Sequence, residues 1–329
     1  MLKVLEERGF ANHEILAAAS PKSFGRQIAF AGRMLTVQSV EEVITQHPDY
    51  AIFSAGAAAS RLYAPRFAEV GTTVIDNSSA WRKEPDKPLV VPEINMQSIR
   101  PGDRIIANPN CSTIQMVLAL SQLHRHYRIK RLVVSTYQSI TGTGIKAVRQ
   151  LQEEEAYHAE EVRQAQHECP TLLDGMPEHS QAYPYQIFRN LFPHGGDFLS
   201  DGYTTEEQKL VDETRKILGD NEIAVSATVA RVPVVGGHSE SVNVEFHKEF
   251  DLEEARQIIA DTEGVVLMDE PAQNRYPMPI VSEGRDEVFV GRVRRDPSQP
   301  KTLNLWVVAD NLRKGAATNA IQIMERLIR

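Results

Sequence analysis

The stretch RIIANPNCSTIQMVLAL, residues 104–120, predicts a buried strand, a turn and a helix in direct succession. Residues 104–107 are mainly apolar, and Pro109 ends the strand because its ring removes a backbone donor. Asn110 is a residue type that caps helices, and Cys111 follows it at the first turn. Short apolar strands joined to helices in this way are typical of an α/β fold.

Cys111 is well placed to act as a nucleophile. A helix start leaves backbone N–H groups unpaired and carries partial positive charge, and both favour a thiolate. Free cysteines are more often buried apolar residues, however. The turn alone therefore leaves a reactive thiol and a packing residue both open.

The composition is that of an ordinary globular protein with room for two domains. The 329 residues are 42% hydrophobic and 24% charged, and the net charge of -8 argues against nucleic acid or an anionic membrane as a partner. No apolar stretch reaches the length of a membrane span, and the start lacks a signal-peptide pattern. With only Cys111 and Cys169 available for a disulfide, we expect a cytoplasmic protein.

Apolar runs alternate with amphipathic stretches along the first half, which predicts an α/β fold there. Expected strands are residues 14–18, 50–54, 73–76 and 104–107, and expected helices are 1–8, 40–46, 57–70 and 112–125. Further strands are expected at 129–137, 223–232, 239–247, 286–293 and 303–308, with helices at 145–158 and from the 310–317 motif to Ile328. Residues 159–203 show no clean period and predict loops or a partner-facing surface.

Other polar residues could serve Cys111. His238 follows two glycines and titrates in the range that suits acid–base work. Arg231 is a fixed cation that can hold a carboxylate with two hydrogen bonds. Glu206 and Lys209 share one face of a predicted helix. Taken singly, each of these residues is better explained as a surface histidine, a solvated arginine or an ordinary helix ion pair than as a site residue.

Several motifs together resemble those of the aspartate-semialdehyde dehydrogenase family. They occur in the family's order and span essentially the whole chain. The motifs are DNSSAWR (76–82), VVPEIN (90–95), NPNCST (108–113), YQSITG (137–142), RVPVVGGHSE (231–240) and ADNLRKGA (309–316).

The resemblance implies an oxidoreductase of amino-acid biosynthesis, supplying lysine, threonine and methionine. Its reversible reaction converts L-aspartate 4-semialdehyde, phosphate and NADP into 4-aspartyl phosphate and NADPH through a cysteine thioester. By family position, Cys111 attacks the carbonyl and His238 takes and returns the proton. Gln138 orients the intermediate, and Asn110 with nearby backbone N–H groups stabilises its oxyanion. No metal is implied.

The resemblance also assigns substrate and cofactor contacts. Arg231 and Gln138 would bind the substrate, Arg231 through its α-carboxylate, and Glu206 would hold the α-ammonium, while Arg82 and Lys209 would hold phosphate. The cofactor NADP would be bound by residues in three places along the chain. These are Lys22 and Ser23 at the 2′-phosphate, the loop Ser54, Ala55 and Gly56, and Thr141, Gly142 and Asn311 near the nicotinamide. Lysine at 22 replaces the family's usual arginine and keeps only the charge, so NADP is favoured over NAD moderately.

The implied architecture is a Rossmann-type dinucleotide-binding domain, residues 1–109 with 311–329, and an α+β catalytic and dimerisation domain, residues 110–310. A homodimer is implied. The family begins with a buried strand and a glycine-rich phosphate loop, whereas this sequence starts within the following helix, so we expect that first strand to be absent. Either residues upstream of Met1 complete the protein, or it is a shortened paralogue.

Two alternatives of other kinds stay open. A non-catalytic paralogue with defective cofactor binding would act as a subunit or binding protein. A related reductase of an N-acyl-glutamyl-phosphate type would share the thiol, but an acetylated nitrogen needs no carboxylate partner, so Glu206 discriminates against it.

Overall fold

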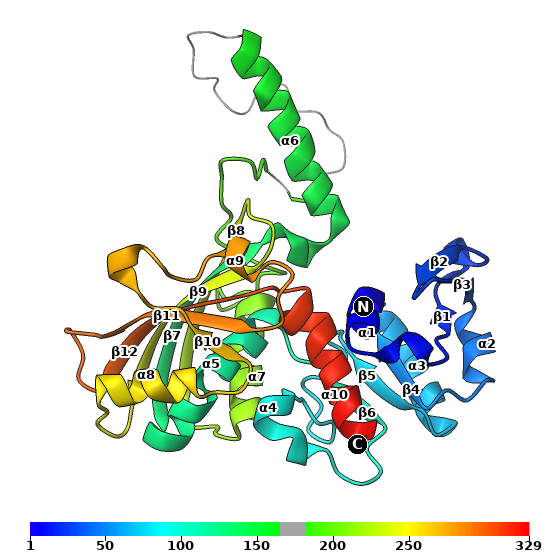
Figure 1. Cartoon of the computed structure of the whole chain (residues 1–329), viewed down its shortest axis with the longest axis horizontal. Helices are drawn as coiled ribbons and strands as arrows, with labels where there is room; N and C mark the ends of the chain where they lie inside the picture. Colours follow the sequence, from blue (N-terminus) through cyan, green and yellow to red (C-terminus); the bar gives the residue numbers. More distant parts are fainter. Residues whose placement is uncertain (165–181, 184, 329) are drawn as a thin grey trace.

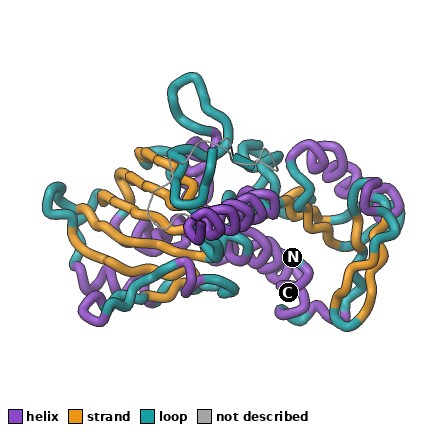
Figure 2. Tube along the Cα trace, turned by 90° about the horizontal axis from the view of Figure 1, so that it is seen from above, coloured by secondary structure: helices purple, strands orange, loops and turns teal. Residues whose placement is uncertain are grey.

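The computed structural model describes residues 1–164, 182–183 and 185–328. Figure 1 shows an α/β unit built on a large sheet, a smaller unit that contains the N-terminal strands, and a helix, α6 (Ile145–Gln164), that projects away from both. Figure 2, seen from above, places the large sheet and the N-terminal strands at opposite ends of the molecule. Cys169, His167 and His179 lie outside the described residues.

Three parallel strands form the centre of the smaller unit, in the order β4-β5-β6. They are β4 (Tyr50–Phe53), β5 (Thr73–Asp76) and β6 (Ile105–Ala107), and α3 (Ala57–Glu69) connects the first two. All four residues of β5 are buried, as expected for a central parallel strand. This confirms the strands predicted at 50–54, 73–76 and 104–107.

A second three-stranded sheet, in the order β1-β3-β2, lies in the same unit. It contains β1 (Ala17–Ala18), β2 (Gln27–Phe30) and β3 (Arg33–Gln38). The hairpin of β2 and β3 turns at Ala31 and Gly32, both with positive φ, and was not predicted. Among the described residues, no strand lies between β1 and β4 to join this sheet to the parallel one.

The larger unit is a six-stranded mixed sheet in the order β10-β11-β12-β9-β7-β8. Helices α5 (Cys111–Tyr127), α7 (Thr205–Leu218) and α8 (Leu252–Ala260) pack on it around one apolar core. The strands are β7 (Ile129–Ser139), β8 (Ala224–Val232), β9 (His238–Phe246), β10 (Val265–Leu267), β11 (Val288–Arg295) and β12 (Thr302–Ala309).

The C-terminal helix α10 (Thr318–Ile328) returns to the N-terminal half of the chain (Figure 1). Its Ile321 shares an apolar core with Leu5 of α1 (Leu2–Glu7), Ile75 of β5 and Ile106 of β6. Both ends of the sequence thus stabilise the same small sheet.

The remaining short helices connect these layers. They are α2 (Val40–Ile44), α4 (Pro92–Asn95) and α9 (Pro279–Ser282). Helix α6 continues six residues beyond its predicted end at 158, and α8 and β10 were not predicted. No helix in the described part of the chain is long and apolar enough to cross a bilayer.

Candidate active site

Cys111 and His238 face each other at the start of α5 and the start of β9. The Cys111 Sγ lies 3.2 Å from His238 Nε2, and the histidine is fully buried whereas the cysteine is partly exposed. Residues 127 positions apart in the chain therefore form a thiol–imidazole pair, the arrangement needed for nucleophilic catalysis.

The ring orientation of His238 is set by a backbone donor. The Ser139 N–H donates to His238 Nδ1 at 2.9 Å, so Nδ1 is an acceptor and the neutral ring carries its proton on Nε2, toward the sulfur. Burial, followed by the nearby Arg231 cation, lowers the pKa of His238 to about 3. At neutral pH the imidazole is uncharged and presents a hydrogen-bond donor to the reaction centre.

Opposing charges act on the Cys111 thiol. Burial raises its pKa to about 11, and the Glu206 carboxylate adds to this shift. Arg231 and Arg82 act in the other direction because their positive charge favours the thiolate. The free protein therefore holds a neutral thiol whose ionisation depends on these neighbouring charges.

Asn110 stabilises the turn before Cys111 through hydrogen bonds of both its side chain and its backbone N–H. Its Oδ1 caps α5 by accepting the Ser112 and Thr113 N–H groups at 3.0 and 3.2 Å. Its Nδ2 donates to Glu206 Oε1 at 2.7 Å, and its backbone N–H donates to the Glu213 carboxylate at 2.6 Å. The predicted site residue Asn110 thus lies beside the thiol and fixes its position.

The carboxyl ends of β7 and β8 supply Gln138 and Arg231. Gln138 is buried and donates to Ser112 Oγ at 2.9 Å, while Arg231 donates to the Ser139 carbonyl at 2.8 Å. A Cβ built on Gly142 would lie 3.1 Å from Arg231 Nη1 and 3.3 Å from His238 Cε1. A side chain at 142 would crowd the site, which explains the glycine.

Helix α7 brings Glu206 and Lys209 to the same place, where they form an ion pair at 2.8 Å. Burial alone would raise the pKa of Glu206, but Lys209, Asn110 and Arg231 outweigh it and lower the pKa to about 2. Glu206 is therefore a carboxylate at all physiological pH values, and Lys209 is the cation beside it.

Arg82 reaches the site from the loop after β5. It contacts Glu213 at 3.3 Å through Nη1 and the Asn77 carbonyl at 3.0 Å through Nη2. Its Nε is buried and has no hydrogen-bond partner among the described residues. An unpaired buried donor of a cation is costly, so this edge of Arg82 is suited to an anionic ligand.

Two residues predicted near the nicotinamide, Thr141 and Asn311, lie close to the turn that carries the thiol. Thr141 donates to Asn311 Oδ1 at 2.9 Å. A Cβ on Gly315 would come within 2.9 Å of the Cys111 Cβ and 3.6 Å of the Asn311 Cβ. The C-terminal motif at 309–316 is thus packed directly beside the nucleophile.

The other predicted cofactor residues lie in the smaller unit. Lys22 and Ser23 form part of a 3₁₀ turn, η2 (Pro21–Ser23), after β1. Ser54, Ala55 and Gly56 connect β4 to α3, and all three are exposed. Gly56 has a φ of 86°, and α3 has no side-chain cap, so its first N–H groups are open to an anion.

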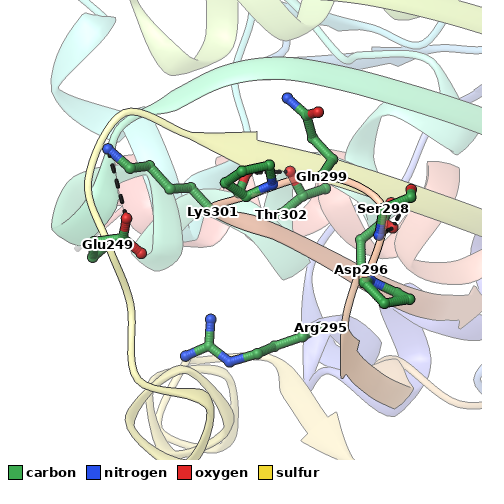
Figure 3. A pocket seen from close by; sticks show the side chains of 9 residues that line it. Glu249, Arg295, Asp296, Ser298, Gln299, Lys301 and Thr302 are labelled. Atoms are coloured by element: carbon green, nitrogen blue, oxygen red, sulfur yellow. Dashed lines mark hydrogen bonds and ion pairs between the residues drawn. The ribbon is translucent and has the colours of Figure 1, made fainter.

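A surface cavity of about 330 Å³ lies elsewhere, at the turn between β11 and β12 (Figure 3). It is lined by Glu249, residues 295–302 and none of the predicted site residues. Its Lys301 is paired with Glu249 at 3.8 Å, as Figure 3 shows. Among the described residues, no group of side chains is arranged to hold a metal ion.

Two residues of this cluster were missed from the sequence. Glu213 follows Glu206 by seven positions and so lies on the same helix face, a spacing that could have indicated it. Ser139 acts through its backbone N–H, for which side-chain chemistry gives no signal.

Known proteins match this chain from end to end. A family model described as the semialdehyde dehydrogenase NAD-binding domain matches residues 1–101, and the semialdehyde dehydrogenase dimerisation domain matches residues 120–314. Aspartate-semialdehyde dehydrogenase of Aquifex aeolicus is 49% identical over 331 residues, covering 100% of this chain and 94% of that protein. The Bacillus subtilis enzyme of the same name is 41% identical, covering 99% and 93%.

Solved structures agree with this match. The crystal structure of aspartate semialdehyde dehydrogenase II from Vibrio cholerae has a TM-score of 0.91 and 42% identity, over 100% of this chain and 94% of that one. The structure of the same enzyme complexed with ASA gives 0.90.

The fold and the match to the NAD-binding domain model together define a nicotinamide-dependent dehydrogenase. Within that class, the chain belongs to the aspartate-semialdehyde dehydrogenase family.

Proposed function

We propose that this chain catalyses the reversible, phosphate-dependent conversion of L-aspartate 4-semialdehyde to 4-aspartyl phosphate. The observation that carries the proposal is the Cys111–His238 pair at 3.2 Å with Arg231 and Glu206 beside it. A thiol, a cation and a carboxylate match an aldehyde, an α-carboxylate and an α-ammonium on one small molecule. The ASA complex of the Vibrio cholerae relative supports the same substrate.

The residues suggest how the chemistry proceeds. The Cys111 thiol releases its proton to solvent, the resulting thiolate adds to the aldehyde carbon, and the new oxyanion accepts a hydrogen bond from His238 Nε2–H, since Ser139 keeps the ring proton on that atom. The sequence had predicted that His238 takes and returns a proton, and the Ser139 contact favours the donor role. The nicotinamide cofactor, when bound, supplies the hydride acceptor. Phosphate then opens the thioester and releases Cys111.

Phosphate is assigned to Arg82 and Lys209. The buried Nε of Arg82 has no partner among the described residues, and Lys209 is paired with Glu206, whose carboxylate acts on the Cys111 thiol. Two cations suit a dianion, which supports assigning both to phosphate.

NADP is assigned as the cofactor, within the NAD-binding family match. The open N-terminus of α3 at Gly56 fits the pyrophosphate, and the exposed Lys22 with Ser23 fits a 2′-phosphate. Thr141 and Asn311 would meet the nicotinamide half beside Cys111. The residues present therefore fit a dinucleotide with an extra phosphate.

The assembly is assigned as a homodimer of a cytoplasmic enzyme, because a dimerisation-domain model covers residues 120–314 and the nucleophile must stay reduced. Sedimentation in solution tests the dimer, and a monomer would contradict it.

The dinucleotide-binding unit is assigned to residues 1–109 with 311–329, supported by the core that Leu5 shares with Ile321. Residues 110–310 would then form the catalytic and dimerisation unit.

The test is an assay of NADP reduction by aspartate semialdehyde, with and without inorganic phosphate. We expect phosphate-dependent turnover that Cys111→Ala abolishes, because the thioester cannot form without the thiol. The acetylated glutamate semialdehyde serves as the control substrate and should turn over far more slowly, since it offers no ammonium to Glu206. Full turnover by Cys111→Ala, or preference for the acetylated substrate, would contradict the proposal.

A further inference from the structure

Glu213 is a buried carboxylate on α7 that joins two separate loops of the site. Its Oε2 accepts the Asn110 backbone N–H at 2.6 Å, and its Oε1 lies 3.3 Å from Arg82 Nη1. The residue is 3% exposed. Burying a carboxylate is costly unless its oxygens are paired, so these two partners account for the position of Glu213.

The two loops have different tasks in the proposed reaction. Asn110 caps the helix that begins with Cys111, and Arg82 comes from the loop after β5 with an unpartnered, buried Nε. Glu213 holds Arg82 at Nη1, and the Asn77 carbonyl holds it at Nη2. With both terminal nitrogens held, the direction of the free Nε is fixed relative to the nucleophile.

Helix α7 presents its charged side chains in a stripe. Glu206, Lys209 and Glu213 recur at i, i+3 and i+7 and so lie on one face. Glu206 binds the side chain of Asn110 and Glu213 binds its backbone. One rigid helix thereby sets the positions of the phosphate cations and of the turn that carries the thiol.

We propose that Glu213 is a positioning residue for the phosphate step, holding Arg82 in register with the Cys111 thioester. In that step a phosphate oxygen bonds to the acyl carbon, the carbon–sulfur bond breaks, and Cys111 leaves as a thiolate. The inference rests on the proposed function. It adds that the phosphate site is oriented by a carboxylate that need not touch phosphate itself.

The experiment compares Glu213→Gln with Asp212→Asn in the complete protein. Gln keeps a carbonyl oxygen for the Asn110 N–H but places an uncharged amide against Arg82. Asp212 is the matched control, because it is the adjacent acid on α7 and pairs with Lys83 at 2.8 Å, next to Arg82 in the chain. We expect Glu213→Gln to raise the KM for phosphate about tenfold, with the KM for aspartate semialdehyde within about twofold, because charged hydrogen bonds are the strong ones. Asp212→Asn should leave both constants unchanged.

A double variant separates positioning from general loss of structure. If Glu213 acts through Arg82, adding Glu213→Gln to Arg82→Gln should change the phosphate KM little further, and the double variant leaves no unpaired buried charge that would prevent folding. The inference would be overturned by equal increases in the KM values for phosphate and for aspartate semialdehyde, or by additive effects of Arg82→Gln and Glu213→Gln on the phosphate KM. A Glu213→Gln variant that behaves like Asp212→Asn would also overturn it. Absence of phosphate-dependent turnover in the unmodified protein would instead refute the proposed function.

Discussion

At the residue scale, the reactivity of Cys111 depends on burial and on neighbours of opposite charge. Glu206 raises the pKa of the thiol and Arg231 lowers it, on top of the larger effect of burial, which brings the pKa to about 11. Below that pKa the thiolate fraction grows tenfold for each pH unit or for each unit by which the pKa falls. Small changes in local charge should therefore change the rate of thiol chemistry directly.

Removing the charge of Glu206 and removing that of Arg231 should change the rate of Cys111 alkylation by iodoacetamide in opposite directions. At pH 8 we expect Glu206→Gln to speed alkylation about tenfold and Arg231→Gln to slow it by a similar factor, as for a pKa shift of about one unit. Glu253→Gln, an exposed acid on α8, is the control and should have no effect. The rate of every variant should rise with pH. Shifts of the same sign in the two site variants would show that charge does not govern this thiol.

At the element scale, the turn before α10 is held by a buried ion pair. Lys314 is 1% exposed and donates to both oxygens of Glu93 at 2.8 Å, as well as to Asn319 and Gln322. Lys314 lies one residue before Gly315, which packs on the Cys111 Cβ. The pair thus anchors the C-terminal segment that closes the site.

Lys314→Met should destabilise the protein by about 3–5 kcal/mol, because it leaves Glu93 buried and uncompensated. The measurement is the free energy of unfolding from urea denaturation. Lys3→Met breaks the exposed pair with Glu7 at 3.9 Å and should cost less than about 1 kcal/mol. Lys314→Met combined with Glu93→Leu should recover part of the loss. A single variant as stable as the control would show that the pair is not needed for the fold.

The elements that could be predicted are those with strong local signals. The buried strands β4, β5 and β6 and the helix at Cys111 follow from apolar runs and capping residues, and the structure confirms them. The β2–β3 hairpin and β10 were not predicted, because β2 and β10 have only four and three residues and the six-residue β3 alternates over only part of its length, at Leu35 and Val37. Local sequence also could not show that Lys314 is buried, since the opposite charge that pairs with it, Glu93, lies 221 positions away.

At the scale of the whole molecule, the site collects residues from six parts of the chain. They lie after β5, at the start of α5, at the ends of β7 and β8, in the first turns of α7 and at the start of β9. Spacing in the sequence cannot reveal such a convergence. The family resemblance indicated these residues. In the structure His238, Arg231, Glu206 and Arg82 all lie close enough to Cys111 to contact its thiol or shift its pKa. Lys22 and Ser54 lie apart from that cluster, in loops of the smaller unit.

The central claim is that Cys111 carries the acyl group between the aldehyde and the acyl phosphate. The most direct measurement mixes the protein with aspartate semialdehyde and NADP without phosphate, quenches with acid, and locates adducts by peptide mass spectrometry. We predict an aspartyl group on the peptide containing Cys111, lost when phosphate is added before the quench. A protein that turns over substrate but carries no adduct there, or carries it on another residue, would contradict the account.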